Sequence, residues 1–270
     1  KKKKEKSRMG EIIMAPEIDE QLKDIAEDVK STKRLKDEYF NCMLYGPPGT
    51  GKTMFAKELA RHTGLDYAIM SGADLTQLPV GKAITELHLM FDWAENCKDG
   101  TIIFIDECEA FLANRAMDGV SEDSRKLTQA FLSRVEKPSH PKIMLIFATN
   151  CPEQLDPAAL SRISRRVEIQ TPAVPEAAKL FDMYLNKLAM AKGVEFDESF
   201  DSSKEELVAT IVSEKFAGRE IEEAVKNIIR KSRHSPEGVV TTAVAKKVIT
   251  LQANELRKQR ENKKSILLGE

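Results

Sequence analysis

The sequence has few of the features that mark membrane-spanning, disulfide-bonded or nucleic-acid-binding chains. No apolar run approaches the roughly 20 residues needed to cross a bilayer, and no secretory signal is visible. The four cysteines form no C-x-x-C pair and no Cys/His metal spacing, which is ordinary for a reducing compartment. Only 6% of residues are aromatic and the formal net charge is −1, which argues against a nucleic-acid partner. Membrane association is expected only through segments outside this chain.

The 270 residues are 41% hydrophobic and 31% charged, which suits one large globular domain or two smaller ones. Residues 1–11 read as a charged linker. Up to about Thr171, strand-like apolar runs alternate with helical patterns, and from residue 172 only amphipathic helices follow. We therefore expect an α/β domain over residues 1–171 and a small helical lid with a charged tail over residues 172–270. The first residue is lysine, so we expect a fragment of a longer protein.

Residues 46–53, Gly-Pro-Pro-Gly-Thr-Gly-Lys-Thr, fit the phosphate-binding pattern G-x-x-x-x-G-K-[ST]. The apolar run 42–45 before them suits a buried strand, and residues 54–61 after them have the period of a helix. Gly49 and Gly51 allow the backbone to aim several N–H groups at one anion. The helix that follows adds its positive N-terminal end. The motif thus sits in the strand–loop–helix context that it requires.

This pattern predicts a Mg²⁺–nucleotide site. Lys52 is expected to reach the β- and γ-phosphates, and the Thr53 hydroxyl is expected to bind Mg²⁺. The residues expected to contact ATP or ADP are those of the loop and of the start of its helix: Pro47, Pro48, Gly49, Thr50, Gly51, Lys52, Thr53 and Met54.

A second acidic motif follows another buried-type strand. Residues 101–105 are a β-branched apolar run that ends in Asp106 and Glu107. Open α/β sheets bind ligands at the carboxyl ends of their strands, so we interpret this stretch as a Walker B element. Asp106 is expected to hold the Mg²⁺ complex, and Glu107 to orient or deprotonate the attacking water. Asn150 follows the apolar strand 143–148, where its amide can contact the γ-phosphate or that water.

Together, the double-proline loop, Ile-Ile-Phe-Ile-Asp-Glu, Ala-Thr-Asn and Asp-Pro-Ala with the arginines after it resemble the AAA+ ATPases, and within them the AAA clade. The segments at 66–72, 89–94 and 216–220 are similar to the mitochondrial inner-membrane AAA-domain proteins of animals and plants, or to a bacterial relative. The resemblance implies a P-loop NTPase three-layer αβα domain with a five-stranded parallel sheet in the order 5-1-4-3-2. It also implies a homo-oligomeric ring, usually a hexamer, with ATP at each subunit junction. The compartment would be the matrix side of the inner membrane, or the bacterial cytoplasm.

By this resemblance, Asn150 matches the sensor-1 residue and Arg219 the sensor-2 arginine that reaches from the lid to the phosphates. Arg162 matches an arginine finger that stabilises charge on the transferred phosphoryl group of the neighbouring subunit. Two departures stand out. Ser161 occupies the first of two finger positions, and Pro79 occupies the position of the pore-loop aromatic residue that grips a threaded peptide.

We therefore expect Mg-dependent ATP hydrolysis by a ring that remodels an unidentified protein substrate or a membrane-associated assembly. The alternative is a nucleotide-gated oligomeric scaffold with slow turnover and no threading, which Pro79 favours. Asp106, Glu107 and Arg162 favour the motor.

Four further expectations concern individual segments and residues. Residues 75–82 read as a loop, with a helix from about Ala83. Trp93 is expected in or near the core, and Leu78 is a partial substitute for the missing pore aromatic residue. Oxidation of the cysteines at 108 and 151 is a hypothetical control of hydrolysis, against the simpler interpretation that both are buried small residues.

Overall fold

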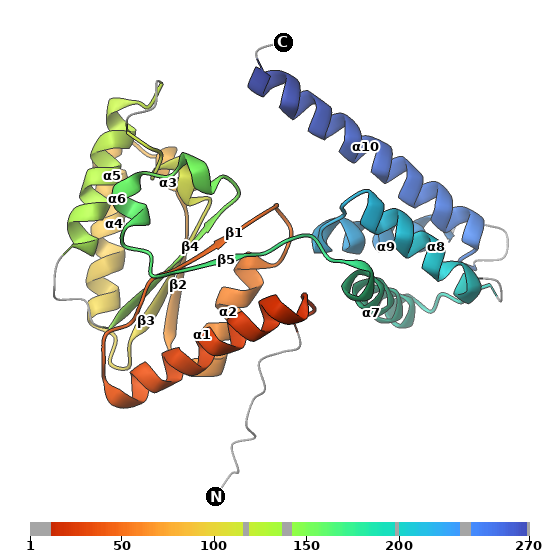
Figure 1. Cartoon of the computed structure of the whole chain (residues 1–270), viewed down its shortest axis with the longest axis horizontal. Coiled ribbons are helices and arrows are strands. Elements are labelled where there is room, and N and C mark those ends of the chain that lie inside the picture. Colours follow the sequence, from red (N-terminus) through yellow and green to blue (C-terminus); the bar gives the residue numbers. More distant parts are fainter. Residues whose placement is uncertain (1–11, 116–118, 137–141, 198–199, 233–238, 269–270) are drawn as a thin grey trace, which may run out of the picture. The chain divides into compact units, whose positions relative to one another are not determined.

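The computed structural model describes residues 12–115, 119–136, 142–197, 200–232 and 239–268. The chain divides into two compact units (Figure 1). The first contains Pro16–Ile169, and the second contains residues 170 onward together with Ile13–Ala15. That the two units are the domains expected from the change near Thr171 stays a prediction. The expected linker at 1–11 lies outside the described residues.

The first unit is built on a parallel sheet. Its strands are β1 (Cys42–Tyr45), β2 (Asp66–Ser71), β3 (Thr101–Asp106), β4 (Ile143–Thr149) and β5 (Arg165–Glu168). All neighbours pair in parallel, in the order β2-β3-β4-β1-β5. Read from the other edge, this is the order 5-1-4-3-2, so the predicted five-stranded parallel sheet is confirmed in the part of the chain that the structure describes.

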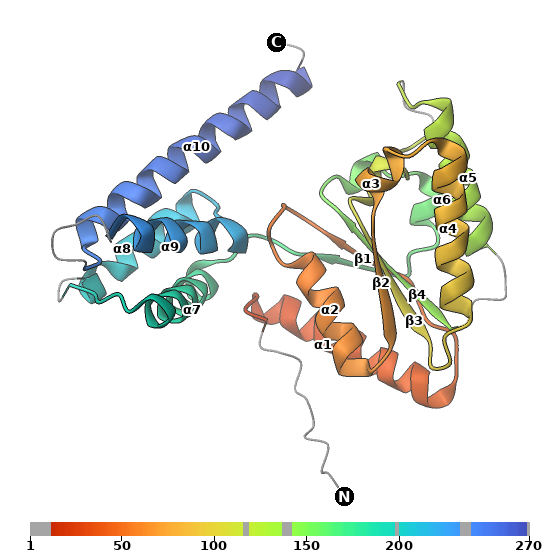
Figure 2. The same ribbon diagram turned by 180° about the vertical axis from the view of Figure 1, so that it is seen from behind.

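Helices cover both faces of this sheet. They are α1 (Pro16–Leu35), α2 (Lys52–Thr63), α3 (Gly72–Thr76), α4 (Val80–Glu95), α5 (Glu122–Val135) and α6 (Pro157–Leu160), with 3₁₀ turns η1 (Cys108–Ala110) and η2 (Pro152–Gln154). Figures 1 and 2 show α1 and α2 over one face and α4 and α5 over the other. Because both faces are covered, β4 is buried along its whole length. The three-layer αβα arrangement is the predicted one.

Packing on the α4–α5 face is dominated by aromatic side chains. The Phe131 ring centroid lies 5.9 Å from that of Phe91 and 6.0 Å from that of Phe147, so α5, α4 and β4 meet at one point. Ile103 and Ile105 of β3 belong to the same buried cluster. Side chains of a strand alternate between the two faces, so this spacing is the one that a buried strand requires.

The strand register brings the carboxyl ends of β1, β3 and β4 to the same edge. Tyr45 of β1 pairs with Thr149 of β4, and Ile105 of β3 pairs with Phe147 of β4. The chain therefore leaves all three strands at neighbouring points of this edge. This arrangement brings together the three motifs that the sequence marked.

The sequence-based expectations around α4 were partly wrong. The loop is shorter than expected, because residues 75–76 belong to α3 and α4 already begins at Val80. Trp93 is 44% exposed and does not lie in the core. The helical period explains this, since residue 93 is turned about 200° from the buried Phe91 at ~100° per residue. The periodic apolar face of α4 consists of Ala83, Leu87, Phe91 and Ala94.

The second unit is helical. It consists of α7 (Val174–Lys192), α8 (Phe200–Ser213), α9 (Gly218–Ser232) and α10 (Thr242–Leu268). Its core is a separate cluster with members from every helix, such as Phe181, Ile211, Ile228 and Val248. No helix in the described residues is both long enough and apolar enough to span a bilayer.

Gly72, the first residue of α3, allows β2 to pass close to the segment after β3. A Cβ atom on Gly72 would lie 2.4 Å from the Glu107 carbonyl oxygen, which is backbone and cannot swing away. We expect Gly72→Ala to lower the free energy of unfolding of the first unit by about 1–3 kcal/mol, as overpacking does. Urea denaturation followed by the fluorescence of Trp93, the only tryptophan, measures this change.

The matched control is Gly81→Ala in the first turn of α4, where an added Cβ meets nothing within 4 Å. This variant should be neutral or stabilised by less than ~1 kcal/mol, because alanine favours the helix. Equal denaturation midpoints for the two variants would contradict the close approach at Gly72.

Candidate functional site

The phosphate-binding motif forms a tight loop between β1 and α2. Positive φ angles occur at Gly46 (136°), Gly49 (77°) and Gly51 (102°), in the region that L side chains rarely adopt. The Gly46 N–H donates to the Thr149 carbonyl at 3.3 Å, which ties the loop to the end of β4. Helix α2 starts directly after Gly51, so its free N–H groups and its positive end border the loop.

The side chain of Lys52 is buried within this loop. Its Nζ donates to the carbonyl oxygens of Gly46 and Pro47, both at 2.8 Å, and to Asn150 Oδ1 at 3.0 Å. The predicted phosphate-binding lysine and the predicted sensor-1 asparagine thus contact each other, although 98 positions separate them in sequence. A triphosphate in the loop would give this buried cation anionic partners, which bind it more strongly than neutral carbonyls do.

The two predicted metal-binding side chains also contact each other. Thr53 Oγ1 donates to Asp106 Oδ2 at 2.8 Å. Oxygen donors of this kind fit Mg²⁺, which usually takes one or two protein ligands and completes its shell with water and phosphate oxygens. Within the described ranges, no group of three or more His, Cys, Asp or Glu side chains has the geometry of a protein-only metal site. The residues present therefore fit Mg²⁺ bound together with a nucleotide.

Glu107 has an unusual backbone conformation for a residue with a side chain. Its φ is 49° and its ψ 44°, in the left-handed region, and its side chain is exposed at the edge of the sheet. Its N–H donates to Asp106 Oδ1 at 3.1 Å. A left-handed non-glycine residue costs on the order of 1 kcal/mol or more and persists where the surroundings hold it in place. This conformation turns the predicted water-activating carboxylate out of the strand.

Sequence reasoning missed Glu109. Its Oε1 accepts the Asn150 N–H at 3.4 Å, and its Oε2 is buried with no hydrogen-bond partner among the described residues. Glu109 therefore helps to hold the segment that contains Asn150. The acidic spacing Asp106-Glu107-x-Glu109 was the available signal, and the same spacing is also typical of an ordinary acidic turn.

The remaining loop residues lie around this centre. Pro47, Pro48 and Met54 are exposed, and Thr50 Oγ1 donates to the Pro47 carbonyl at 2.9 Å. Arg219, the predicted sensor-2 residue, is exposed in the first turn of α9 in the second unit. Its expected role at the phosphates stays a prediction.

Arg162 follows α6 and is half-buried. Its Nη1 donates to the Ala158 carbonyl, and its Nη2 pairs with Glu136 just after α5. Ser161, at the first of the two finger positions, directly follows α6 and donates to the same carbonyl at 2.8 Å. The partners of the Arg162 side chain are therefore Ala158 and Glu136 of the same chain, and neither belongs to the phosphate loop at 46–53.

The two later arginines are also engaged within the chain. Arg165 pairs with Asp28 of α1 and lies over the Phe40 ring, with 4.7 Å between its Cζ and the ring centroid. Arg166 Nη2 donates to the Leu160 carbonyl at 3.0 Å.

Pro79 directly precedes α4 and is exposed, whereas Leu78 is half-buried and packs against the core. That Leu78 partly substitutes for a pore aromatic residue stays a prediction.

Cysteines at the two strand ends differ in their surroundings. Cys108 is fully buried, and burial, with the nearby Glu109 carboxylate, raises the pKa of its thiol well above the usual range. Burial also raises the pKa of Cys42 to about 12, whereas Cys151 is half-buried. A raised pKa leaves less thiolate at neutral pH, and thiolate is the reactive form. This favours the interpretation of Cys108 as a packing residue.

We expect Lys52→Ala to weaken ATP binding by on the order of 10²-fold or more, because a buried cation with several charge-assisted hydrogen bonds is lost. Titration calorimetry with Mg-ATP measures the affinity. Lys57→Ala, on an exposed position of the same helix, is the matched control and should bind like the native protein. Equal affinities for the two variants would contradict the site.

We expect Cys151 to be alkylated by iodoacetamide at about pH 8 well before Cys108 and Cys42, because the buried thiols stay protonated at that pH. Peptide mass spectrometry at successive times gives the three rates, and denatured protein provides the fully reactive reference. Native Cys108 reacting as fast as Cys151 would revive the oxidation hypothesis.

Comparison with known proteins agrees with this geometry. The family model described as "ATPase family associated with various cellular activities (AAA)" matches residues 42–171. The chain is 38% identical over 239 residues to ATPase family AAA domain-containing protein 3 of Bos taurus, an alignment that covers 86% of this chain and 40% of that protein. It is 40% identical over 217 residues to the ATPase family AAA domain-containing protein 3A homolog of Drosophila melanogaster, an alignment that covers 78% of this chain and 35% of that protein.

The human relative, ATPase family AAA domain-containing protein 3A, is 37% identical over 239 residues, with coverage of 86% and 40%. The chain thus spans about two fifths of the length of the curated relatives it matches. The sheet order, the contacts of the phosphate loop and these matches agree, and the chain belongs to the AAA+ ATPases as a relative of the ATPase family AAA domain-containing protein 3 group.

Proposed function

We propose that this chain hydrolyses ATP with Mg²⁺ as part of an oligomeric ring and couples hydrolysis to the remodelling of a protein or membrane-associated assembly. Membership of the AAA ATPases supports the nucleotide-binding part of this proposal. The observation that carries the hydrolysis part is the pair of contacts Lys52–Asn150 and Thr53–Asp106, which gather groups for phosphate, metal and water at one edge of the sheet.

Each residue would have a distinct task. Lys52 and the loop N–H groups bind the phosphates, and Thr53 and Asp106 orient the metal. Mg²⁺, when bound, supplies positive charge that stabilises the phosphate oxygens. Glu107 accepts a proton from the attacking water, and the Asn150 amide helps to orient that water.

Arg162 is the residue whose proposed role requires a ring. Its cation would have to exchange Glu136 for the phosphates of a nucleotide in the neighbouring subunit. Such an arginine contributes on the order of 10³–10⁵ in rate in other phosphoryl-transfer systems. The absence of a partner from its own phosphate loop is what favours action between subunits.

A nucleotide-gated scaffold is the second candidate, and Pro79 favours it. An exposed proline in front of α4 cannot clamp a threaded peptide as an aromatic side chain does. In this candidate, ATP binding drives assembly and partner docking, and turnover is slow.

The deciding experiment is the ATPase rate per subunit as a function of protein concentration. For the ring motor, the rate should rise with assembly, Arg162→Ala should bind ATP normally but lose most of the assembled rate, and Glu107→Gln should fall on the order of 10²-fold or more while retaining ATP. A native rate that is low and unchanged by assembly or by Glu107→Gln would favour the scaffold. A full rate in the dilute monomer would contradict the trans role of Arg162.

A further inference from the structure

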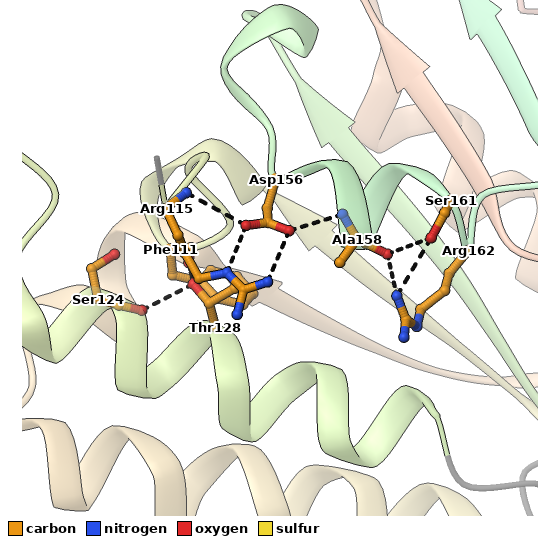
Figure 3. Close-up of polar contacts among 8 residues, drawn as sticks. All are labelled: Phe111, Arg115, Ser124, Thr128, Asp156, Ala158, Ser161 and Arg162. Carbon is orange, nitrogen blue, oxygen red and sulfur yellow. Dashed lines mark hydrogen bonds and ion pairs between the residues drawn. The ribbon is translucent and has the colours of Figure 1, made fainter. Parts of the chain in front are cut away.

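A continuous set of hydrogen bonds joins the segment that follows the Walker B strand to Arg162 (Figure 3). We propose that Arg115 is a positioning residue for Arg162, acting through the Asp156 carboxylate and helix α6. The proposal rests on the proposed role of Arg162 as a finger that acts on the neighbouring subunit. Arg115 itself would contact neither ATP nor Mg²⁺.

The first link is the contact between Arg115 and Asp156. Arg115 Nε lies 2.7 Å from Oδ2 and Nη2 3.4 Å from Oδ1, and the Arg115 N–H also reaches Oδ2 at 3.4 Å. The Asp156 side chain is 3% exposed, whereas that of Arg115 is 42% exposed. Removing a solvent-exposed partner from a buried carboxylate leaves that carboxylate uncompensated, so this pair differs from an ordinary surface ion pair.

The Asp156 carboxylate is held in its charged form. Burial acts to raise its pKa, but the hydrogen bonds from Arg115 and from the Ala158 N–H outweigh burial and lower it. The hydrogen bond between the Arg115 and Asp156 side chains also raises the pKa of Arg115. Both groups therefore stay charged across the physiological range.

The second link runs from Asp156 to Arg162. Asp156 Oδ1 accepts the Ala158 N–H at 2.9 Å and so fixes the first turn of α6. The carbonyl of the same residue, Ala158, accepts from Arg162 Nη1. Figure 3 shows the side chains of Arg115, Asp156 and Arg162 in a row, with Ala158 between Asp156 and Arg162. A shift of Asp156 would therefore move the anchor of the arginine.

The third link attaches Arg115 to the Walker B end of β3. Asp156 N–H donates to the Leu112 carbonyl and Asn114 N–H to the Gln154 carbonyl, both at 2.8 Å, beside an antiparallel bridge between residues 113 and 155. Thr128 of α5 donates to the Phe111 carbonyl and fixes the same segment. Only a few residues separate this segment from Glu107. A change at Glu107 thus has a short covalent and hydrogen-bonded route to Arg162.

The test uses mixed rings, because a group that acts through Arg162 must act on the neighbour's nucleotide. Arg115→Gln rings and Arg162→Ala rings should each hydrolyse ATP more slowly than native rings. For Arg115→Gln, kcat should fall on the order of 10²-fold, as expected for a misplaced group, and KM for ATP should change less than about twofold. Each is then mixed with Glu107→Gln subunits, which cannot hydrolyse ATP but retain native Arg115 and Arg162. Both mixtures should regain activity above the sum of the separate rings.

Arg257→Gln is the matched control. Arg257 and Glu214 in the second unit form the same two-pronged pair, with Nε 2.7 Å from one carboxylate oxygen and Nη2 on the other, and side chains that are 58% and 11% exposed. Its loss should leave kcat unchanged. Arg115→Lys keeps the positive charge but loses the two-pronged contact with the carboxylate. It replaces Arg115→Gln in every comparison if circular dichroism shows that Arg115→Gln does not fold.

The outcomes are separable. A native kcat for Arg115→Gln overturns the positioning role. The role is also overturned if Glu107→Gln subunits restore the ATPase rate of Arg162→Ala rings but not that of Arg115→Gln rings. If Arg162→Ala itself is not restored, the trans finger of the proposed function fails, and the role of Arg115 falls with it. Restoration of both variants supports the proposal.

Discussion

The site depends on one electrostatic constraint, the buried ammonium group of Lys52. A cation removed from water requires oxygen partners, and here they come from the loop after β1 and from the residue after β4. The sheet supplies both because β1 and β4 are neighbours. Three features of the fold together place oxygen atoms around the Lys52 ammonium group: the strand order, the positive φ angles of the loop and the burial of β4.

The sequence predicted which residues lie together at this centre, because their signals are local. A glycine pattern between a strand and a helix, and carboxylates at the end of an apolar run, depend on spacing alone. Parallel strands then bring their carboxyl ends together, so the contact between Thr53 and Asp106 followed from topology. The family resemblance supplied the strand order that periodicity could not.

The features that the sequence did not predict depend on side-chain direction, on where a helix begins and on long-range contacts. Trp93 looked apolar enough for the core, but its position on α4 turns it to solvent. Pro79 marked a loop, yet it directly precedes a helix that starts three residues earlier than expected. No sequence motif marked Arg115, and only an acidic spacing marked Glu109, because the contacts of both residues are with partners about 40 positions away. Long-range polar pairing of this kind is visible only in three dimensions.

The ion pair between Arg162 and Glu136 has a consequence for how subunits would associate. If the arginine exchanges a carboxylate of its own chain for a phosphate of the next, the number of ion pairs at that point is the same before and after association. Added salt then screens both sides of the exchange. Ring closure at this contact would be governed by the shape and desolvation of the surrounding surfaces, and would depend only weakly on ionic strength.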